Sequence, residues 1–175
     1  MKKVLIISAS MRGDSNSHAL CEKVAEGVRA AGNEAEIVRL RGRKIGFCTG
    51  CYACQKTGRC VIKDDANDIV EKICRADAVV FGTPVYYFSI AGQLKALLDR
   101  SVFKWPEPNG KPYYLVATMA ENAEWDLVKA PIQGYIDCFD GAELKGYLKA
   151  GGVYEEGAVR STPFMDEAFE LGRGI

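Results

Sequence analysis

Short apolar runs that alternate with amphipathic, helix-like segments constrain the fold of this chain more than any other feature. The run Lys3–Ser8 (KVLIIS) is nearly unbroken and rich in β-branched residues, and Asp77–Gly82 (DAVVFG) repeats the pattern. Strands of a parallel sheet look like this because helices cover both of its faces. Further strands are predicted at Glu34–Leu40, Pro112–Thr118 and Tyr147–Gly151.

Apolar residues at helical spacing fill the intervals between these runs. The first predicted helix follows Ser15, Asn16 and Ser17, which can cap it, and ends before Gly32. Right-handed crossovers then give a three-layer α/β/α fold, with a ligand crevice beyond the carboxyl ends of the strands. The other predicted helices run from Asp64 and Asp65 to Ala76, from Ala91 to Arg100, from Ala123 to Cys138 and from Pro163 to Gly172.

Length and charge exclude several classes of protein. A chain of 175 residues predicts a single domain, 1–175, whose one long irregular stretch is the Cys-rich loop 41–63. The formal net charge is +0, so nucleic acid is not an expected partner. The apolar run Val4–Ile7 is too short for a signal peptide or a membrane span, and we therefore expect a cytoplasmic protein with no membrane partner.

The loop after the first predicted strand has the composition of an anion site. Between Ser8 and Ser17 it carries four hydroxyls, the amide of Asn16 and the guanidinium of Arg12. Backbone N–H groups and the helix dipole favour an anion at the start of a helix, and Arg12 can add charge-assisted hydrogen bonds. A plain helix cap explains the same composition equally well.

Familiar phosphate-binding motifs are absent from this loop. It matches neither G-x-G-x-x-G nor G-x-x-x-x-G-K-[ST], and the second strand ends in Arg39-Leu40-Arg41 without an acidic residue to hold a ribose. The spacing from Cys54 to Arg59 is one residue short of a Cys-x5-Arg phosphatase loop. Dinucleotide-binding, P-loop and phosphatase interpretations therefore fail.

The loop after the third predicted strand, Gly82–Ser89, contains three adjacent aromatic residues: Tyr86, Tyr87 and Phe88. Flat apolar side chains stiffened by Pro84, next to a phosphate site, suit a planar ring such as that of flavin mononucleotide. Taken singly, each of these aromatic residues is more often a packing residue.

The cysteines of the 41–63 loop are spaced as ligands. Cys48, Cys51, Cys54 and Cys60 form a compact run of the kind that holds an iron–sulfur cluster, and four thiolates also suit zinc. The odd total of seven cysteines makes a disulfide framework improbable. Cys21, Cys74 and Cys138 lie in predicted helices and are expected to be buried, whereas His18, the single histidine, is expected at the surface.

Three segments together resemble one known family, the flavodoxin-like NAD(P)H-dependent FMN reductases, which include iron–sulfur flavoproteins. They are S-x-R-x-x-S-N-S from Ser10 to Ser17, TPVYYFSIAGQLKALLDR from Thr83 to Arg100, and C-x2-C-x2-C-x5-C-x3-D-D from Cys48 to Asp65. The resemblance covers nearly the whole chain and implies a five-stranded parallel sheet of order 2-1-3-4-5. In one respect the chain departs from the family, because Met119-Ala120-Glu121-Asn122 replaces the glycines often found after the fourth strand.

The resemblance also implies roles for individual residues. It implies that the loop after the first strand binds the phosphate of FMN and that the aromatic loop lies along the isoalloxazine. Lys95, Asp99 and Arg100 look structural. The candidate cofactor-binding residues are Ser10, Arg12, Asn16, Ser17, Thr83, Pro84, Val85, Tyr86, Tyr87, Phe88 and Thr118. Conditional ligands of a [4Fe–4S] cluster are Cys48, Cys51, Cys54 and Cys60.

Three functions stay open at this point. The first is an oxidoreductase that passes electrons from NAD(P)H through FMN to a small quinone- or flavin-like acceptor, with no catalytic side chain because the flavin carries the chemistry. The second is an electron carrier that exchanges single electrons between FMN, a [4Fe–4S] cluster and a redox protein. The third is a zinc-binding module. By resemblance we expect a homodimer or homotetramer.

Overall fold

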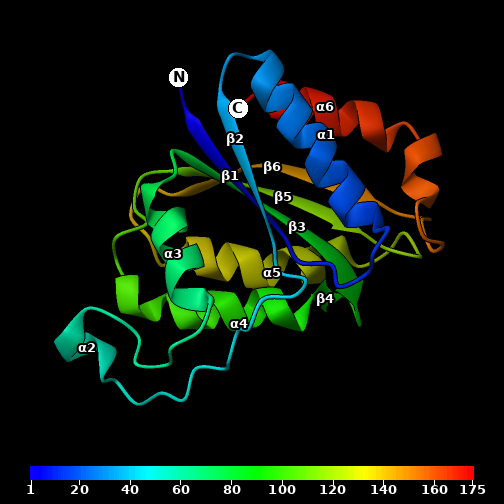
Figure 1. Cartoon of the computed structure of the whole chain (residues 1–175). Helices are drawn as coiled ribbons and strands as arrows, with labels where there is room; N and C mark the ends of the chain where they lie inside the picture. Colours follow the sequence, from blue (N-terminus) through cyan, green and yellow to red (C-terminus); the bar gives the residue numbers. More distant parts are fainter.

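The apolar runs form the middle strands of a parallel sheet in a computed structural model that describes residues 1–175 (Figure 1). The parallel strands lie in the order β2-β1-β3-β5-β6, which confirms the flavodoxin-like order 2-1-3-4-5 predicted for five parallel strands. Their bounds are Lys3–Ser8 for β1, Glu34–Arg39 for β2, Ala78–Tyr86 for β3, Pro112–Thr118 for β5 and Glu143–Ala150 for β6.

Helices cover both faces of this sheet (Figure 1). On one face, α1 and α6 enclose a core with the β1 side chains of Val4 and Ile6, and on the other face α3, α4 and α5 enclose a second core around Leu5 and Ile7. None of the helices combines the length and the apolar composition that a membrane span requires. The helix bounds are Asn16–Ala30 for α1, Ala66–Arg75 for α3, Gly92–Arg100 for α4, Trp125–Ile136 for α5 and Phe164–Arg173 for α6.

Two predicted boundaries of the sheet were wrong. β3 does not end at Gly82 but continues to Tyr86, because a short antiparallel strand, β4 (Ser89–Ile90), pairs with its last residues. The segment predicted as an aromatic loop is therefore a β-hairpin. β6 starts at Glu143 rather than Tyr147, since its first residues pair with the start of β5.

The contact between α1 and α6 depends on two glycines. A Cβ atom at Gly27 would lie 2.0 Å from the carbonyl oxygen of Phe169, and one at Gly172 would lie 2.1 Å from that of Val24. Both distances are far inside van der Waals contact. The two helix backbones touch here, so this face of the domain tolerates no side chain at either position.

Candidate functional site

The serine-rich loop predicted from the sequence joins the carboxyl end of β1 to the N-terminus of α1. Ser10, Ser15 and Ser17 are buried there. The hydroxyl of Ser15 accepts a hydrogen bond from the amide of His18 at 3.2 Å and lies 3.2 Å from the hydroxyl of Ser17. The structure thus has the predicted helix cap, and it places several hydroxyls at the positive end of the helix.

Asn16 has a different role from its neighbours. Its side-chain amide donates hydrogen bonds to the carbonyls of Val153 (3.3 Å) and Glu155 (2.8 Å), and its side-chain oxygen accepts one from the amide of Val159 at 3.2 Å. These bonds fasten the segment between β6 and α6 onto the N-terminus of α1. Asn16 therefore shapes the wall of the candidate anion site, and its polar atoms are already engaged within the chain.

Arg12 is exposed at the rim of the same loop. Its guanidinium donates to the carbonyl of Tyr154 at 3.1 Å and makes no ion pair. The backbone of the loop is held from the other side by Arg39, whose guanidinium donates to the carbonyls of Arg12 and Gly13, both at 3.3 Å. The charge of Arg12 is thus free to meet an anionic ligand.

A cleft of about 160 Å³ opens between these elements. It brings together residues that the sequence places far apart: Ser10, Arg12 and Asn16 from the serine-rich loop, Pro84, Val85 and Tyr86 from β3, and Thr118 from β5. Binding pockets for small molecules usually measure about 300 to 1,000 Å³. The cleft is smaller than this range, so it could enclose only part of a ligand the size of a nucleotide.

The hairpin tip has an unusual backbone. Tyr87 and Phe88 connect β3 to β4 and have positive φ angles of 50° and 55°. Two-residue hairpin turns with positive φ at both positions normally contain Asn and Gly, because a side chain is strained in that conformation. The turn leaves Tyr87 fully exposed and Tyr86 half exposed. The strained turn at Tyr87 and Phe88 therefore lies where aromatic side chains are exposed to solvent beside the cleft.

Thr83 and Thr118 lie below the mouth of the site rather than at its surface. The hydroxyl of Thr83 donates to the carbonyl of Pro84 at 2.8 Å and accepts from the amide of Ala91 at 2.9 Å, so it fixes the hairpin to the start of α4. Thr118 ends β5 and lines the cleft together with Ala120. Ala120 is one of the four residues after this strand that replace the glycines often found in the resembled family.

The four cysteines of the 41–63 loop line one cavity of about 720 Å³. The loop includes a one-turn helix that was not predicted, α2 (Cys54–Thr57), which Figure 1 shows well away from the sheet. Cys48 and Cys51 are exposed, and no three cysteine, histidine or acidic side chains are gathered closely enough to hold a metal ion. Backbone hydrogen bonding at Ala53 lowers the pKa of the exposed Cys51 thiol.

This cavity and the aromatic hairpin lie at opposite ends of α4. The cavity is lined by Asp99, Arg100 and Phe103 at the end of the helix, whereas the hairpin leads into Gly92 at its start. A helix rises about 1.5 Å per residue, so the nine residues of α4 separate the two by roughly 13 Å.

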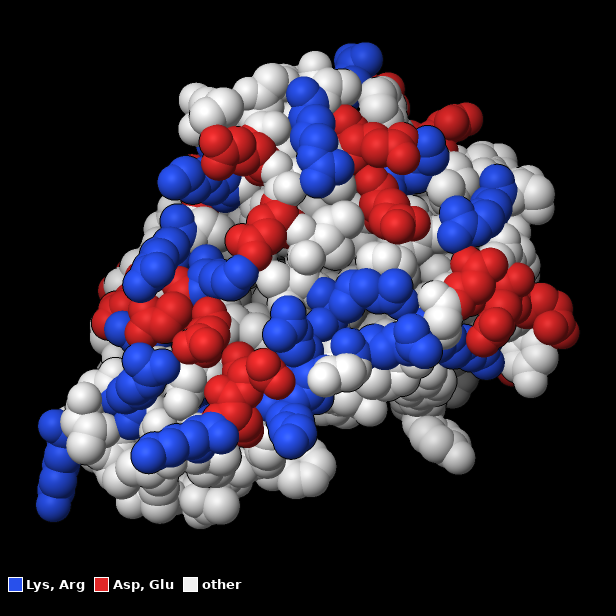
Figure 2. Space-filling model, in the orientation of Figure 1, with Lys and Arg blue, Asp and Glu red and all other residues white.

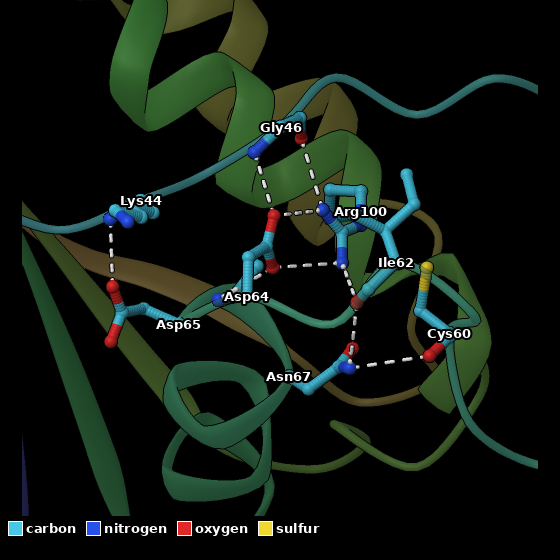
Figure 3. A network of polar contacts seen from close by, with 9 residues as sticks. Lys44, Gly46, Cys60, Ile62, Asp64, Asp65, Asn67 and Arg100 are labelled. Carbon is cyan, nitrogen blue, oxygen red and sulfur yellow. Dashed lines mark hydrogen bonds and ion pairs between the residues drawn. The ribbon is translucent and has the colours of Figure 1, made fainter.

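A buried ion pair closes the neck of the cysteine loop (Figure 3). The guanidinium of Arg100 donates to both carboxylate oxygens of Asp64, at 2.7 and 3.0 Å, and to the carbonyls of Gly46 and Ile62, each at 3.1 Å. Burial alone would raise the pKa of Asp64, but hydrogen bonds from Arg100 and from the amides of Gly46 and Ala66 outweigh it and hold that pKa below its ordinary value. Arg100 thus joins the two ends of the loop.

Three residues differ from their expected burial. His18 is largely buried, with its Nδ1 3.1 Å from the hydroxyl of Ser8, because α1 packs directly on the end of β1. Cys138 is exposed, since α5 ends at Ile136, and Cys74 is only half-buried. Cys21 is buried as expected, and burial raises the pKa of its thiol to about 12.

Comparison with known proteins identifies the family. The sequence profile of the NADPH-dependent FMN reductases matches residues 2–129. This chain belongs to the NADPH-dependent FMN reductase family. The matched residues of this FMN reductase family member include the serine-rich loop, the cysteine loop and the hairpin. They do not include residues 153–159, which hydrogen-bond to the side chain of Asn16.

Relatives of this FMN reductase family member extend the picture. The chain is 44% identical over 99 residues to an iron–sulfur flavoprotein of Archaeoglobus fulgidus, which covers 57% of the chain and 48% of the relative. It is 27% identical over 160 residues to a Bacillus subtilis protein whose name describes an NAD(P)H-dependent FMN-containing oxidoreductase. This match covers 86% of the chain and 85% of the relative. The chain spans about half the length of the iron–sulfur flavoproteins it matches.

Solved structures support the fold of this family member. An NAD(P)H:quinone oxidoreductase from Methanothermobacter marburgensis superposes with a TM-score of 0.72 at 18% identity, covering 99% of this chain and 95% of that one. A flavodoxin from the domain Archaea superposes with a TM-score of 0.63 at 12% identity, and the match covers 99% of this chain and 95% of the flavodoxin. At such identities the likeness concerns the flavodoxin-like fold.

Proposed function

We propose that this chain is an FMN-dependent oxidoreductase that passes electrons from NAD(P)H through bound FMN to a small quinone- or flavin-like acceptor. One observation carries the proposal: the hydroxyl-rich N-terminus of α1 and the aromatic hairpin meet at a single cleft on the carboxyl edge of the sheet. Membership in the NADPH-dependent FMN reductase family supports it.

The residues at the cleft fit FMN by their chemistry. The hydroxyls of Ser10 and Ser15, the amides at the start of α1 and the guanidinium of Arg12 are donors for a phosphate, whereas Ser17 does not line the cleft and its hydroxyl lies 3.2 Å from that of Ser15. Pro84, Val85 and Tyr86 give the cleft its apolar side, and Tyr87 and Phe88 extend that side into solvent. We assign Asn16, Thr83 and Thr118 to the support of this surface, because they are tied into the protein or end a strand.

Bound FMN supplies the redox chemistry, so the protein needs to provide only binding, orientation and access. No imidazole, thiol or carboxylate lines the cleft. The exposed hairpin leaves the ring side open, which suits exchange of a hydride donor and a planar acceptor at the same face. The chain's single histidine, His18, is engaged with Ser8 and Glu22 and is not used.

The test of this function is the absorption spectrum of protein purified without oxygen, before and after NADPH is added. We expect a two-band flavin spectrum that bleaches with NADPH and returns when a quinone is added. Protein that binds FMN but is not bleached by NADPH or NADH contradicts the proposed donor. Protein that binds no FMN contradicts the proposal as a whole.

Replacing Arg12 by alanine is expected to weaken FMN binding by roughly 1 to 3 kcal/mol, because charge-assisted hydrogen bonds to the phosphate are lost. Titration of the apoprotein with FMN, followed by flavin fluorescence, measures the change. Arg29→Ala is the matched control, since Arg29 lies at the other end of α1 and bonds only the carbonyl of Ala35. Equal affinities for wild type and Arg12→Ala would remove Arg12 from the site.

A second candidate function is the iron–sulfur electron carrier, favoured by the four cysteines that line one cavity. The donor set suits a [4Fe–4S] cluster, but the side chains are not gathered into a metal-binding group, so we derive no electron-transfer step through one. The same anaerobic spectrum separates the candidates. Broad brown absorbance beneath the flavin bands, with stoichiometric iron, supports the carrier. Colourless protein containing zinc supports a structural zinc module.

We also propose that the protein is a cytoplasmic homodimer or homotetramer. Several large apolar side chains are exposed on the walls of the cysteine-lined cavity, namely Tyr52, Val61, Val102 and Trp105. Monomeric proteins rarely expose contiguous apolar surface of this kind. Light scattering on the purified protein measures the subunit number.

A further inference from the structure

The tip of the hairpin between β3 and β4 exposes aromatic side chains to solvent. Tyr87 is fully exposed, and Tyr86 and Phe88 on either side of it are exposed as well. Of the three, only Tyr86 lines the cleft, so the other two are not needed to form it. Their positive φ angles belong to a turn that favours Asn and Gly. A strained turn therefore presents two large side chains that the chain itself does not bury.

An unbalanced group of cations lies at the same edge of the sheet. Arg41, Lys44 and Lys63 are exposed, and none of them forms an ion pair. Arg12 and Arg39 belong to the candidate anion site and are separate from this group. The net charge of the chain is +0, so the excess is local. Each carboxylate in the shallow pocket beside Lys44 and Lys63 has an arginine partner instead. These pairs join Asp64 to Arg100, Asp65 to Arg43 and Asp68 to Arg59.

The hairpin and these cations lie side by side. Only β1 separates β2 from β3, and neighbouring strands are about 4.8 Å apart, so the carboxyl ends of β2 and β3 lie roughly 10 Å from each other. Figure 2 shows a continuous blue band over the ends of β1 and β2, and in the same orientation the hairpin of Figure 1 projects just below this band. We call the surface formed by Arg41, Lys44, Lys63, Tyr87 and Phe88 the cationic–aromatic edge.

We propose that the cationic–aromatic edge docks the protein on the surface of a bilayer that contains anionic lipid. Tyrosine is enriched at membrane interfaces, because its ring is apolar and its hydroxyl is polar. Each Lys or Arg close to an anionic bilayer adds about fivefold in affinity. Such a peripheral contact needs no spanning helix. The proposal departs from the expectation of no membrane partner, since that expectation considered only spanning and signal segments.

The aromatic tip favours lipid over an acidic protein as the occupant. A protein partner would need an apolar pocket shaped for Tyr87, whereas lipid adapts to the tip. Charge also sets the orientation, because Glu155 and Glu156 are exposed beyond β6 and would face away from the lipid. Since Tyr86 lines the cleft, docking would bring the cleft to the bilayer, in which apolar quinones dissolve. That consequence rests on the proposed function, whereas docking itself does not.

The experiment measures how the FMN-loaded protein pellets with sucrose-loaded vesicles. Vesicles of phosphatidylcholine alone are compared with vesicles of equal parts phosphatidylcholine and phosphatidylglycerol. We expect roughly tenfold or tighter preference for the mixed vesicles, weakened by salt because the attraction is electrostatic. Arg41→Gln should lose about fivefold of the affinity. Tyr87→Asn, which suits the backbone of the turn, should lose about tenfold through the missing aromatic contact.

Two substitutions are matched controls and should leave vesicle binding unchanged. Lys3→Gln removes an exposed, unpaired lysine at the opposite edge of the sheet, and Tyr52→Asn removes an exposed tyrosine that also has a positive φ angle, in the cysteine loop. Equal binding to both kinds of vesicle, or binding to neither, overturns the proposal, whether or not NADPH bleaches the flavin. Binding of an acidic redox protein without vesicle binding overturns it too. A lower molar mass of Tyr87→Asn in light scattering would place the tip in a subunit interface and contradict the proposal.

Discussion

Replacing Arg100 by methionine is expected to lower the free energy of unfolding by roughly 3 to 5 kcal/mol, the usual cost of leaving one partner of a buried ion pair alone. The side chain of Arg100 is 0% exposed and that of Asp64 is 9% exposed. Methionine fills much of the volume but leaves the buried carboxylate without its cationic partner and the carbonyl of Gly46 without its donor, while the carbonyl of Ile62 keeps only the side-chain amide of Asn67. Urea denaturation measures the loss.

Two controls separate the ion pair from a general sensitivity of α4. Lys95→Ala breaks an exposed pair with Asp99 on the same helix and should cost less than about 1 kcal/mol. In the double variant Arg100→Met and Asp64→Leu, the buried charge is gone, so much of the stability should return. A loss for Arg100→Met no greater than that of Lys95→Ala contradicts the role assigned to Arg100.

The ion pair between Arg100 and Asp64 also makes the stability of the protein depend on pH. The pKa of Asp64 in the folded protein is below its ordinary value of 3.8. Its contribution to stability is therefore complete above that value and is lost as the pH falls below it, toward the folded pKa. Wild-type stability should decline over this acidic range more steeply than that of the double variant, which lacks the titrating carboxylate.

The second large effect is expected from Gly27→Ala. The new Cβ atom would lie 2.0 Å from the carbonyl oxygen of Phe169, and the contact is backbone, which cannot rotate away as a side chain can. Separating α1 from α6 should cost about 3 kcal/mol or more, the upper range for overpacking a core. For a domain of this size, that corresponds to a fall in Tm of roughly 6 to 12 °C. Calorimetry measures the fall.

Gly134→Ala supplies a control with the opposite sign. Gly134 lies within α5, is exposed, and has no atom within 4 Å of the position of a new Cβ. Alanine should therefore stabilise that helix by up to about 1 kcal/mol through its better helix propensity. If both substitutions destabilise the protein equally, the close approach of α1 and α6 is not the cause.

The middle of the fold was predictable because burial leaves a strong pattern. Lys3–Ser8 and Pro112–Thr118 are strands with the predicted bounds, since helices bury them on both faces and only apolar residues fit. The end of β3 was not predictable. Its extension depends on a turn at Tyr87 and Phe88, whereas the sequence signal for such a turn is Asn-Gly or Asp-Gly.

The candidate site was likewise predictable from the sequence only in part. The hydroxyl-rich loop could be identified from local composition, because capping and anion binding use neighbouring residues. The actual bonds of Asn16 could not, since its three partners are 137 to 143 residues away and are backbone groups, which any sequence provides. Burial of His18 likewise depends on how α1 meets β1, which a lone histidine does not reveal.

The hydrogen bonds of Asn16 have a thermodynamic consequence. They join the wall of the anion site to a segment beyond residue 129, where the family match ends. Energetic coupling between two sites is reciprocal. An anion bound against this wall would therefore also stabilise residues 153–159, and any change that loosens those residues would weaken the affinity for the anion. Affinity at the cleft would in this way depend on residues near both ends of the chain.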